Sequence, residues 1–235
     1  MCKNSNTVVL NCLDVTFEVA NRLYENENIL KTKKLLSLGW ITSIAFILGT
    51  YILGSQLEDY SAISQTVSEI GEEGSPLYLQ WQIFSTGIGC LLILFGIGIA
   101  SFAKKNELSV VPGIFILLAG LSQFGIGIFP SPHPLHNVFG LSLTLGYFSP
   151  LLFALLWKNQ LGMKFKRLSL ISFILIVLGI FLNLSPAFSP TLYPLEYYGI
   201  VQRFLLFTFY IYCTFISISL IYSSLILEEP EHNKK

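Results

Sequence analysis

The chain has 235 residues, of which 53% are hydrophobic and only 12% are charged. Soluble domains carry about twice this charged fraction. Here the apolar residues come in runs of about twenty, which is the length needed to cross a bilayer. The formal net charge is zero, so the composition gives no indication of a nucleic-acid partner. These features exclude an ordinary soluble domain and favour an integral membrane protein.

Residues 1–34 form a polar tail of mixed charge, without the apolar stretch of a signal peptide. Apolar and polar residues alternate over 13–19, which hints at a strand. The spacing of Leu13, Phe17, Ala20 and Tyr24 fits a helix as well. We predict a cytoplasmic tail that is either poorly ordered or a surface helix. Residues 228–235 form a second, charged tail.

Between the tails the sequence predicts an all-α membrane bundle. Six apolar runs follow one another at about 35–55, 78–103, 108–129, 135–157, 168–185 and 199–227. A helix rises about 1.5 Å per residue, so each run can span a hydrocarbon core of roughly 30 Å. Pro150 lies inside the fourth run, where a proline predicts a kink.

The basic residues predict the orientation of this six-span bundle. Every Lys and Arg except Arg203 falls in segments that share one side of the membrane. Because basic loops stay in the cytoplasm, that side is expected to be cytoplasmic. An even number of spans then places both termini there, in a multi-pass protein of the cell membrane.

The first outer loop, residues 56–80, is acidic and contains the sequence SAISQTVSEI at 61–70. Ile63, Val67 and Ile70 fall at spacings of four and three, which is typical of one helical face. Gly71 follows as a natural residue beyond a helix C-terminus. We predict a short amphipathic helix in this loop.

The candidate functional residues all lie on the predicted outer side. An arginine within a span costs several kcal/mol unless it is paired or reaches water, so Arg203 is the least ordinary residue of the chain. The full set of candidates is Ser64, Ser68, Glu69, His133, His136, Gln202 and Arg203.

Arg203 has two interpretations. Its planar guanidinium suits a carboxylate or phosphate, so it can act as an anion clamp, with Gln202, Ser68 and His133 as further ligand-binding residues. Alternatively, it forms a structural ion pair with Glu69 or Glu196 that ties the outer loop to the bundle.

Glu69 and His136 also have two interpretations. They are candidates for a catalytic acid–base pair, or else a helix-end carboxylate and a hydrogen-bonded polar residue. Ser64 and Ser68 lack the surroundings of a catalytic nucleophile. His133 and His136 are too few for a zinc site without a third ligand, so we predict neither a metal nor a cofactor.

Three features resemble the domain of unknown function 998 family. They are the SQTVSEIG stretch after the first span, the proline–histidine turn that opens the fourth, and Gln202-Arg203 in the sixth. The resemblance covers about residues 35–227. It implies six-span membrane proteins of prokaryotes with no established activity, and it implies that Ser68, Glu69, Gly71, His136 and Arg203 match motif positions.

The sequence supports three functional hypotheses. The first is a protein whose outward-facing pocket binds an anionic lipid headgroup or metabolite through Arg203. The second is a lipid-directed membrane enzyme that uses Glu69 and His136. The third is a small-solute transporter, which the scarcity of ionisable residues in mid-membrane disfavours. The expected partner is the lipid bilayer, and the sequence leaves protein partners open.

Overall fold

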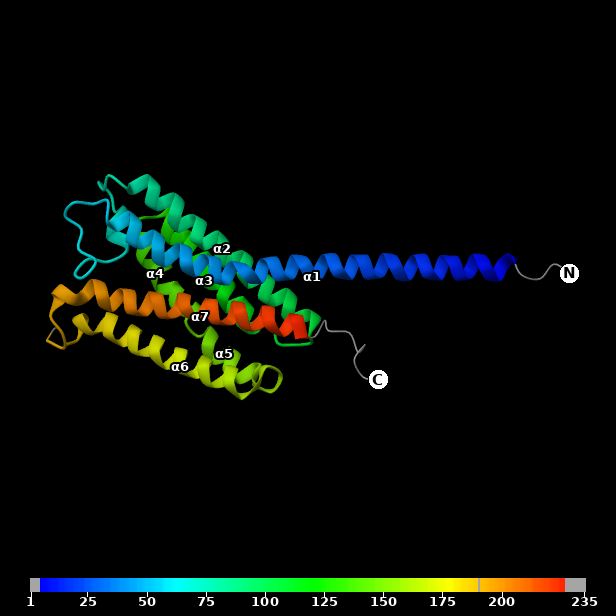
Figure 1. Ribbon diagram of the computed structural model, residues 1–235. Coiled ribbons are helices and arrows are strands. Elements are labelled where there is room, and N and C mark those ends of the chain that lie inside the picture. The colour runs from blue at the N-terminus through cyan, green and yellow to red at the C-terminus, as the bar shows by residue number, and fades with distance from the viewer. Residues whose placement is uncertain (1–4, 190, 227–235) are drawn as a thin grey trace.

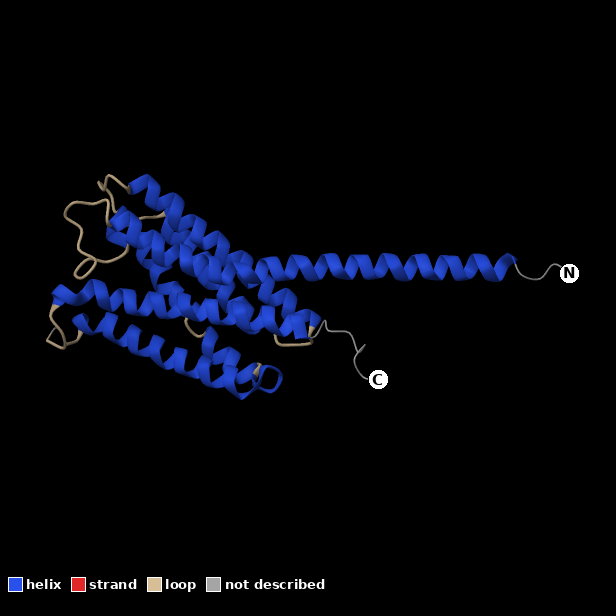
Figure 2. Cartoon of the chain, in the orientation of Figure 1, coloured by secondary structure: helices blue, strands red, loops and turns tan. Residues whose placement is uncertain are grey.

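The computed structural model describes residues 5–189 and 191–226, in which all regular secondary structure is helical (Figure 2). Side chains are described for residues 27–157, 160–189 and 191–223. The helices are α1 (Ser5–Gly54), α2 (Tyr78–Lys105), α3 (Val111–Ile128), α4 (Pro134–Gly146), α5 (Ser149–Leu156), α6 (Lys158–Leu184) and α7 (Tyr198–Ile226). Short 3₁₀ helices lie at η1 (Ser68–Gly71), η2 (Ser185–Ala187) and η3 (Leu195–Tyr197).

Within the described residues, six helical segments are long and apolar enough to cross a membrane. They are 27–54, 78–105, 111–128, 134–156, 160–187 and 195–223. The prediction of an all-α bundle with six spans is therefore confirmed. The fifth segment begins earlier than the predicted 168, and Gly162 makes a turn within it at φ 80°.

The fourth span is divided in two, as Pro150 predicts. α4 ends at Gly146 and α5 begins at Ser149. Proline has no backbone N–H and its ring crowds the preceding turn, so one continuous helix would lose a hydrogen bond here. The break lets α4 pack against α3 and α5 pack against α6.

The tail residues 5–34 belong to α1, whose N-terminal part projects beyond the bundle (Figure 1). Over residues 13–19 the chain is thus helical, and the strand suggested by the alternation does not form. The predicted charged tail at 228–235 lies outside the described residues.

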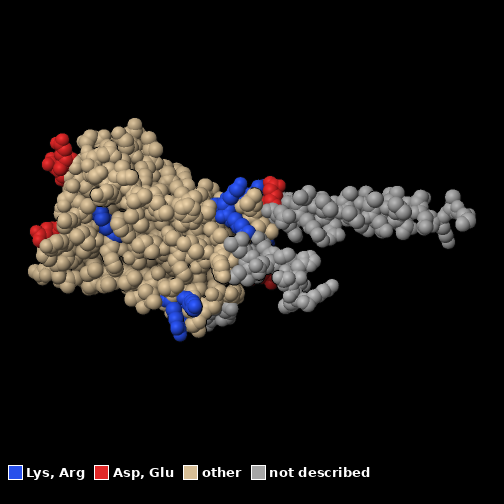
Figure 3. All heavy atoms as spheres, in the orientation of Figure 1, with Lys and Arg blue, Asp and Glu red and all other residues tan. Residues whose placement is uncertain are grey.

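The bundle has two distinct ends. The start of α1 and the end of α7 lie on the same side, here called the tail end (Figure 1). The opposite side, here called the loop end, carries the connecting segments 55–77, 129–133 and 185–197. In the space-filling view, acidic side chains lie at the loop end and also where the projecting part of α1 leaves the bundle, whereas most Lys and Arg lie toward the tail end (Figure 3).

Glycines bring the membrane helices close together. A Cβ on Gly89 of α2 would lie 2.6 Å from Cα of Phe124 on α3, so no side chain fits between the two backbones. Such small residues are the usual means of tight packing where lipid replaces water. Between α1 and α7, Phe46 stacks on Tyr210 with centroids 3.9 Å apart.

The first loop differs from its prediction, because its only described helix is the 3₁₀ helix η1. Here side-chain oxygens bind backbone N–H groups of the loop. Glu69 Oε1 accepts a hydrogen bond from Thr66 N, and Gln65 Oε1 accepts one from Ser61 N. Such local bonds compete with helix formation. Of the three residues of the predicted apolar face, Val67 and Ile70 are buried, whereas Ile63 is 51% exposed.

Gly71 also has a different role from the one predicted. Its φ is not positive, as a left-handed position after a helix would require. Instead, a Cβ on Gly71 would overlap the indole ring of Trp81. The glycine therefore lets the end of η1 lie directly on α2.

Candidate ligand-binding sites at the loop end

The first loop is docked on the start of α7. Ile200 N donates a hydrogen bond to Ile63 O over 3.1 Å. A Cβ on Gly199 would lie 2.7 Å from Ala62 O, so only glycine allows the loop backbone to come this close. This contact brings loop carbonyls to the first turn of the sixth span.

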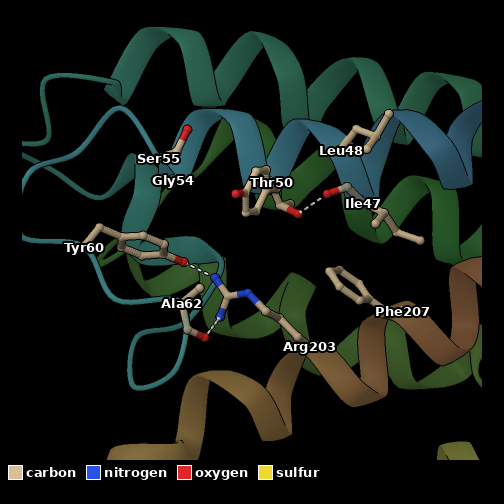
Figure 4. A pocket seen from close by; sticks show the side chains of 10 residues that line it. Ile47, Leu48, Thr50, Gly54, Ser55, Tyr60, Ala62, Arg203 and Phe207 are labelled. Atoms are coloured by element: carbon tan, nitrogen blue, oxygen red, sulfur yellow. Dashed lines mark hydrogen bonds between the residues drawn. The ribbon is translucent and has the colours of Figure 1, made fainter.

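Arg203 holds the loop through those carbonyls. Its Nη1 donates to Ala62 O (2.8 Å), to Gln65 O (2.7 Å) and to Gly199 O of its own helix (3.0 Å). Its Nη2 donates to the Tyr60 hydroxyl (Figure 4), which in turn donates to Thr66 O. The guanidinium carbon lies 5.6 Å from the centroid of the Tyr60 ring.

All of these partners of Arg203 are electrically neutral. Among the described residues, no carboxylate forms an ion pair with it, so the predicted pairing with Glu69 or Glu196 is not observed. Glu69 Oε1 instead accepts from Thr66 N (2.8 Å) and Thr66 Oγ1 (2.7 Å). Burial raises the pKa of the Tyr60 phenol above its ordinary value, although the nearby guanidinium opposes this shift. Tyr60 therefore stays protonated at neutral pH and does not neutralise Arg203.

A groove of about 410 Å³ lies beside Arg203, between α1 and α7. We call it the α1–α7 groove, and Figure 4 shows its residues. Its lining is mostly apolar, and the Tyr60 hydroxyl is bound to Arg203 at one end. It is made by Ile47, Leu48, Thr50, Tyr51, Gly54, Ser55, Tyr60, Ala62, Arg203 and Phe207.

A second cavity, of about 490 Å³, lies within the bundle at the loop end. We call it the central cavity. Residues from α1, α2, α3, α4, α6, α7 and loop 55–77 line it, and they include Ser68, His136 and Gln202. Three of the predicted site residues, from three distant parts of the sequence, thus meet at one cavity.

Two of these side chains have a fixed orientation. The Oε1 atom of Gln202 accepts a hydrogen bond from Val67 N over 2.7 Å. The Nδ1 atom of His136 lies 2.9 Å from Phe129 O. Since a carbonyl can only accept, Nδ1 carries the proton in this contact. The Nε2 atom of a neutral His136 is then a hydrogen-bond acceptor.

The other candidates line neither cavity. His133 caps α4, because its Nδ1 accepts from Leu135 N over 3.1 Å. Ser64 lies in a turn, and its N donates to Ser61 O. Glu69 is held by Thr66, as described above. Among the described residues, no group of three or more His, Cys, Asp or Glu side chains is placed to hold a metal ion.

Sequence reasoning missed several residues of these sites. Tyr60 binds Arg203, and Gly199 lets the loop backbone approach it. A tyrosine in a loop and a glycine at the start of a span are both common, so neither marks a site in the sequence. Gln123 and Asn183 line the central cavity, and both are polar residues within apolar spans. Polar residues in a span usually face the bundle interior, which is the signal that would have found them.

Comparison with known proteins identifies the family of the chain. The chain matches the model of a family described as "Protein of unknown function (DUF998)" over residues 40–219. No curated protein and no solved structure matches it significantly. The matched range contains every residue of the two cavities, four of the six apolar helices in full, and most of the sixth and about half of the first. The chain therefore belongs to the DUF998 family, a family of unknown function.

Proposed function

We propose that this membrane protein binds an anionic phospholipid at its loop end, with the lipid phosphate beside Arg203. The observation that carries the proposal is that Arg203 has only neutral partners among the described residues. Hydrogen bonds to carbonyls satisfy N–H groups but leave the full positive charge in place. Next to a low-dielectric bilayer, that charge strongly favours a nearby anion.

The guanidinium also keeps donors for such an anion. It has five N–H groups in all. Nε has no acceptor among the described residues, and Nη2 has only the Tyr60 hydroxyl. Phosphate oxygens are well suited to the donors of arginine. A phosphate is therefore a better match here than a neutral headgroup.

The α1–α7 groove supports a lipid rather than a soluble anion. Phe207 lies one helical turn beyond Arg203, and Ile47 points toward it from α1 (Figure 4). An acyl chain can lie against these apolar side chains while the headgroup stays near Arg203.

We further propose that the tail end faces the cytoplasm, so that the lipid belongs to the outer leaflet of the cell membrane. The distribution of basic residues supports this orientation. The enzyme hypothesis gains no comparable support, because Glu69 does not line the cavity that contains His136.

The test is native mass spectrometry of the protein released from bilayers of equal phosphatidylglycerol and phosphatidylcholine. We expect the wild type to retain phosphatidylglycerol selectively. The variant Arg203→Gln keeps hydrogen-bond donors but has no charge, and we expect it to lose this preference. Loss of a charged hydrogen bond of about 1.5–3 kcal/mol corresponds to a preference lowered roughly tenfold or more.

Two control variants separate the charge from the docking of the loop. Arg203→Lys keeps the charge but cannot reproduce the planar set of hydrogen bonds. Gly199→Ala pushes the loop away while Arg203 is unchanged. Both are expected to keep the phosphatidylglycerol preference. If Arg203→Gln keeps it as well, or if both controls lose it, Arg203 only anchors the loop and the proposal is wrong.

A further inference from the structure

We infer that the central cavity binds a second, different ligand: a neutral membrane lipid with a free hydroxyl in its headgroup, such as a diacylglycerol. The inference rests on the lining of this cavity and is independent of the lipid proposed for the α1–α7 groove. The volume of about 490 Å³ falls in the usual range of small-molecule sites.

The lining offers hydrogen-bonding groups that the protein itself does not use. Within the part of the chain that the structure describes, Gln202 Nε2, His136 Nε2 and the Tyr147 hydroxyl have no hydrogen-bond partner. A largely buried polar group without a partner costs free energy, and a ligand in the cavity can supply that partner.

These groups select a neutral hydroxyl rather than a phosphate. None of the described residues that line the cavity is Asp, Glu, Lys or Arg. A phosphate would be taken from water without a cation beside it, which is costly. A hydroxyl can donate to His136 Nε2 and accept from the Gln202 amide N–H, so it uses both kinds of group.

The cavity is also placed to receive a ligand from the bilayer. Its walls include Leu141 of α4 and Leu184 of α6, two helices that do not pack extensively on each other. Both side chains are largely exposed, at 70% and 56%. Further in, Leu143, Ile180 and Leu205 provide an apolar surface for acyl chains. A lipid, rather than a free polyol, fits this combination.

The test uses 1,2-dioleoylglycerol, added to the purified full-length protein in detergent and measured by native mass spectrometry. The wild type is expected to bind it, and to bind poorly both its acetylated form, which lacks the hydroxyl, and free glycerol, which lacks the chains. Tyr147→Phe is expected to weaken binding by roughly threefold to tenfold, the effect of one hydrogen bond.

The variant Gly140→Leu is designed to fill the central cavity with a side chain. Gly140 lines it, and a Cβ there meets no atom within 4 Å, so a side chain can be introduced at this position. Gly87→Leu is the matched control, because Gly87 is equally open but lines neither cavity. We expect Gly140→Leu to abolish dioleoylglycerol binding, and Gly87→Leu and Arg203→Gln to leave it unchanged.

Three results would overturn the inference. They are equal binding of dioleoylglycerol and its acetylated form, binding that survives Gly140→Leu, and binding of free glycerol as strong as that of the lipid. Loss of dioleoylglycerol binding in Arg203→Gln would instead assign this lipid to the α1–α7 groove. Because the phosphatidylglycerol experiment depends on Arg203 and not on Gly140, either proposal can fail alone.

Discussion

Arg203 combines two properties that are usually separate in membrane proteins. Its N–H groups are bound to backbone carbonyls and to a phenol, which accounts for its tolerance near an apolar span. Its charge, however, has no ionic partner among the described residues. The hydrogen bonds explain how the loop is held, and the remaining charge explains the proposed selectivity for an anionic lipid.

The neighbouring Gln202 gives a prediction for the same loop. Gln202→Leu removes the acceptor of Val67 N, a backbone N–H that has few alternatives because Val67 is buried. We expect a cost of about 1–3 kcal/mol, seen as faster hydrogen exchange at Val67. Gln82→Leu is the control, since its amide makes only an exposed contact of 3.3 Å. Unchanged exchange at Val67 in Gln202→Leu would mean that this hydrogen bond does not hold the loop.

Sequence alone indicates that Arg203 is unusual but does not indicate its partners. An ion pair with Glu69 was the natural alternative because carboxylates can be recognised in a sequence. Backbone carbonyls cannot, since every residue has one. The carbonyls of Ala62 and Gln65 reach Arg203 only because Gly199 allows the loop to lie on α7.

At the scale of elements, local hydrogen bonds decide where helices form at the loop end. The pattern of Ile63, Val67 and Ile70 predicts a helix, and two of these three residues are indeed buried. The backbone nevertheless makes turns and a single 3₁₀ helix, because Gln65 and Glu69 bind backbone N–H groups nearby. Periodicity thus predicted which residues are buried better than it predicted the helix.

The contact between α2 and α3 gives a prediction at this scale. Gly89→Val places a branched side chain against the backbone at Phe124 and must push the helices apart. We expect overpacking of about 1–3 kcal/mol or more, measured as a lower melting temperature in detergent. Gly87→Val, two residues away, is the control. A Cβ at this position has no atom within 4 Å, and the substitution changes the helix propensity in the same way. Equal melting temperatures for the two variants would refute the close packing at Gly89.

At the scale of the whole molecule, the proposed orientation gives a prediction for chemical labelling. In a chain whose native cysteines are replaced by alanine, Ser61→Cys reports on the loop end and Gln160→Cys on the tail end; both native residues are exposed and neutral. We expect a membrane-impermeant maleimide to label only Ser61→Cys on intact cells, and both variants after the cells are opened. Labelling of Gln160→Cys on intact cells would reverse the proposed orientation.

The six spans were predictable because the length and apolarity of a span are local properties of the sequence. The position of Pro150 similarly predicted the break between α4 and α5. The division of the site residues between two cavities was not predictable, since Ser68, His136 and Gln202 meet only through the packing of several spans. Loop 55–77 then places Tyr60 beside Arg203 and Ser68 beside the central cavity.

The most direct test of the proposed function is an electron-cryomicroscopy map of the full chain in nanodiscs that contain phosphatidylglycerol. We predict phosphate density within hydrogen-bond distance of the Arg203 guanidinium, with an acyl chain continuing along the α1–α7 groove toward Phe207. A map in which the groove is empty, or in which the Glu69 carboxylate has turned to pair with Arg203, would contradict it.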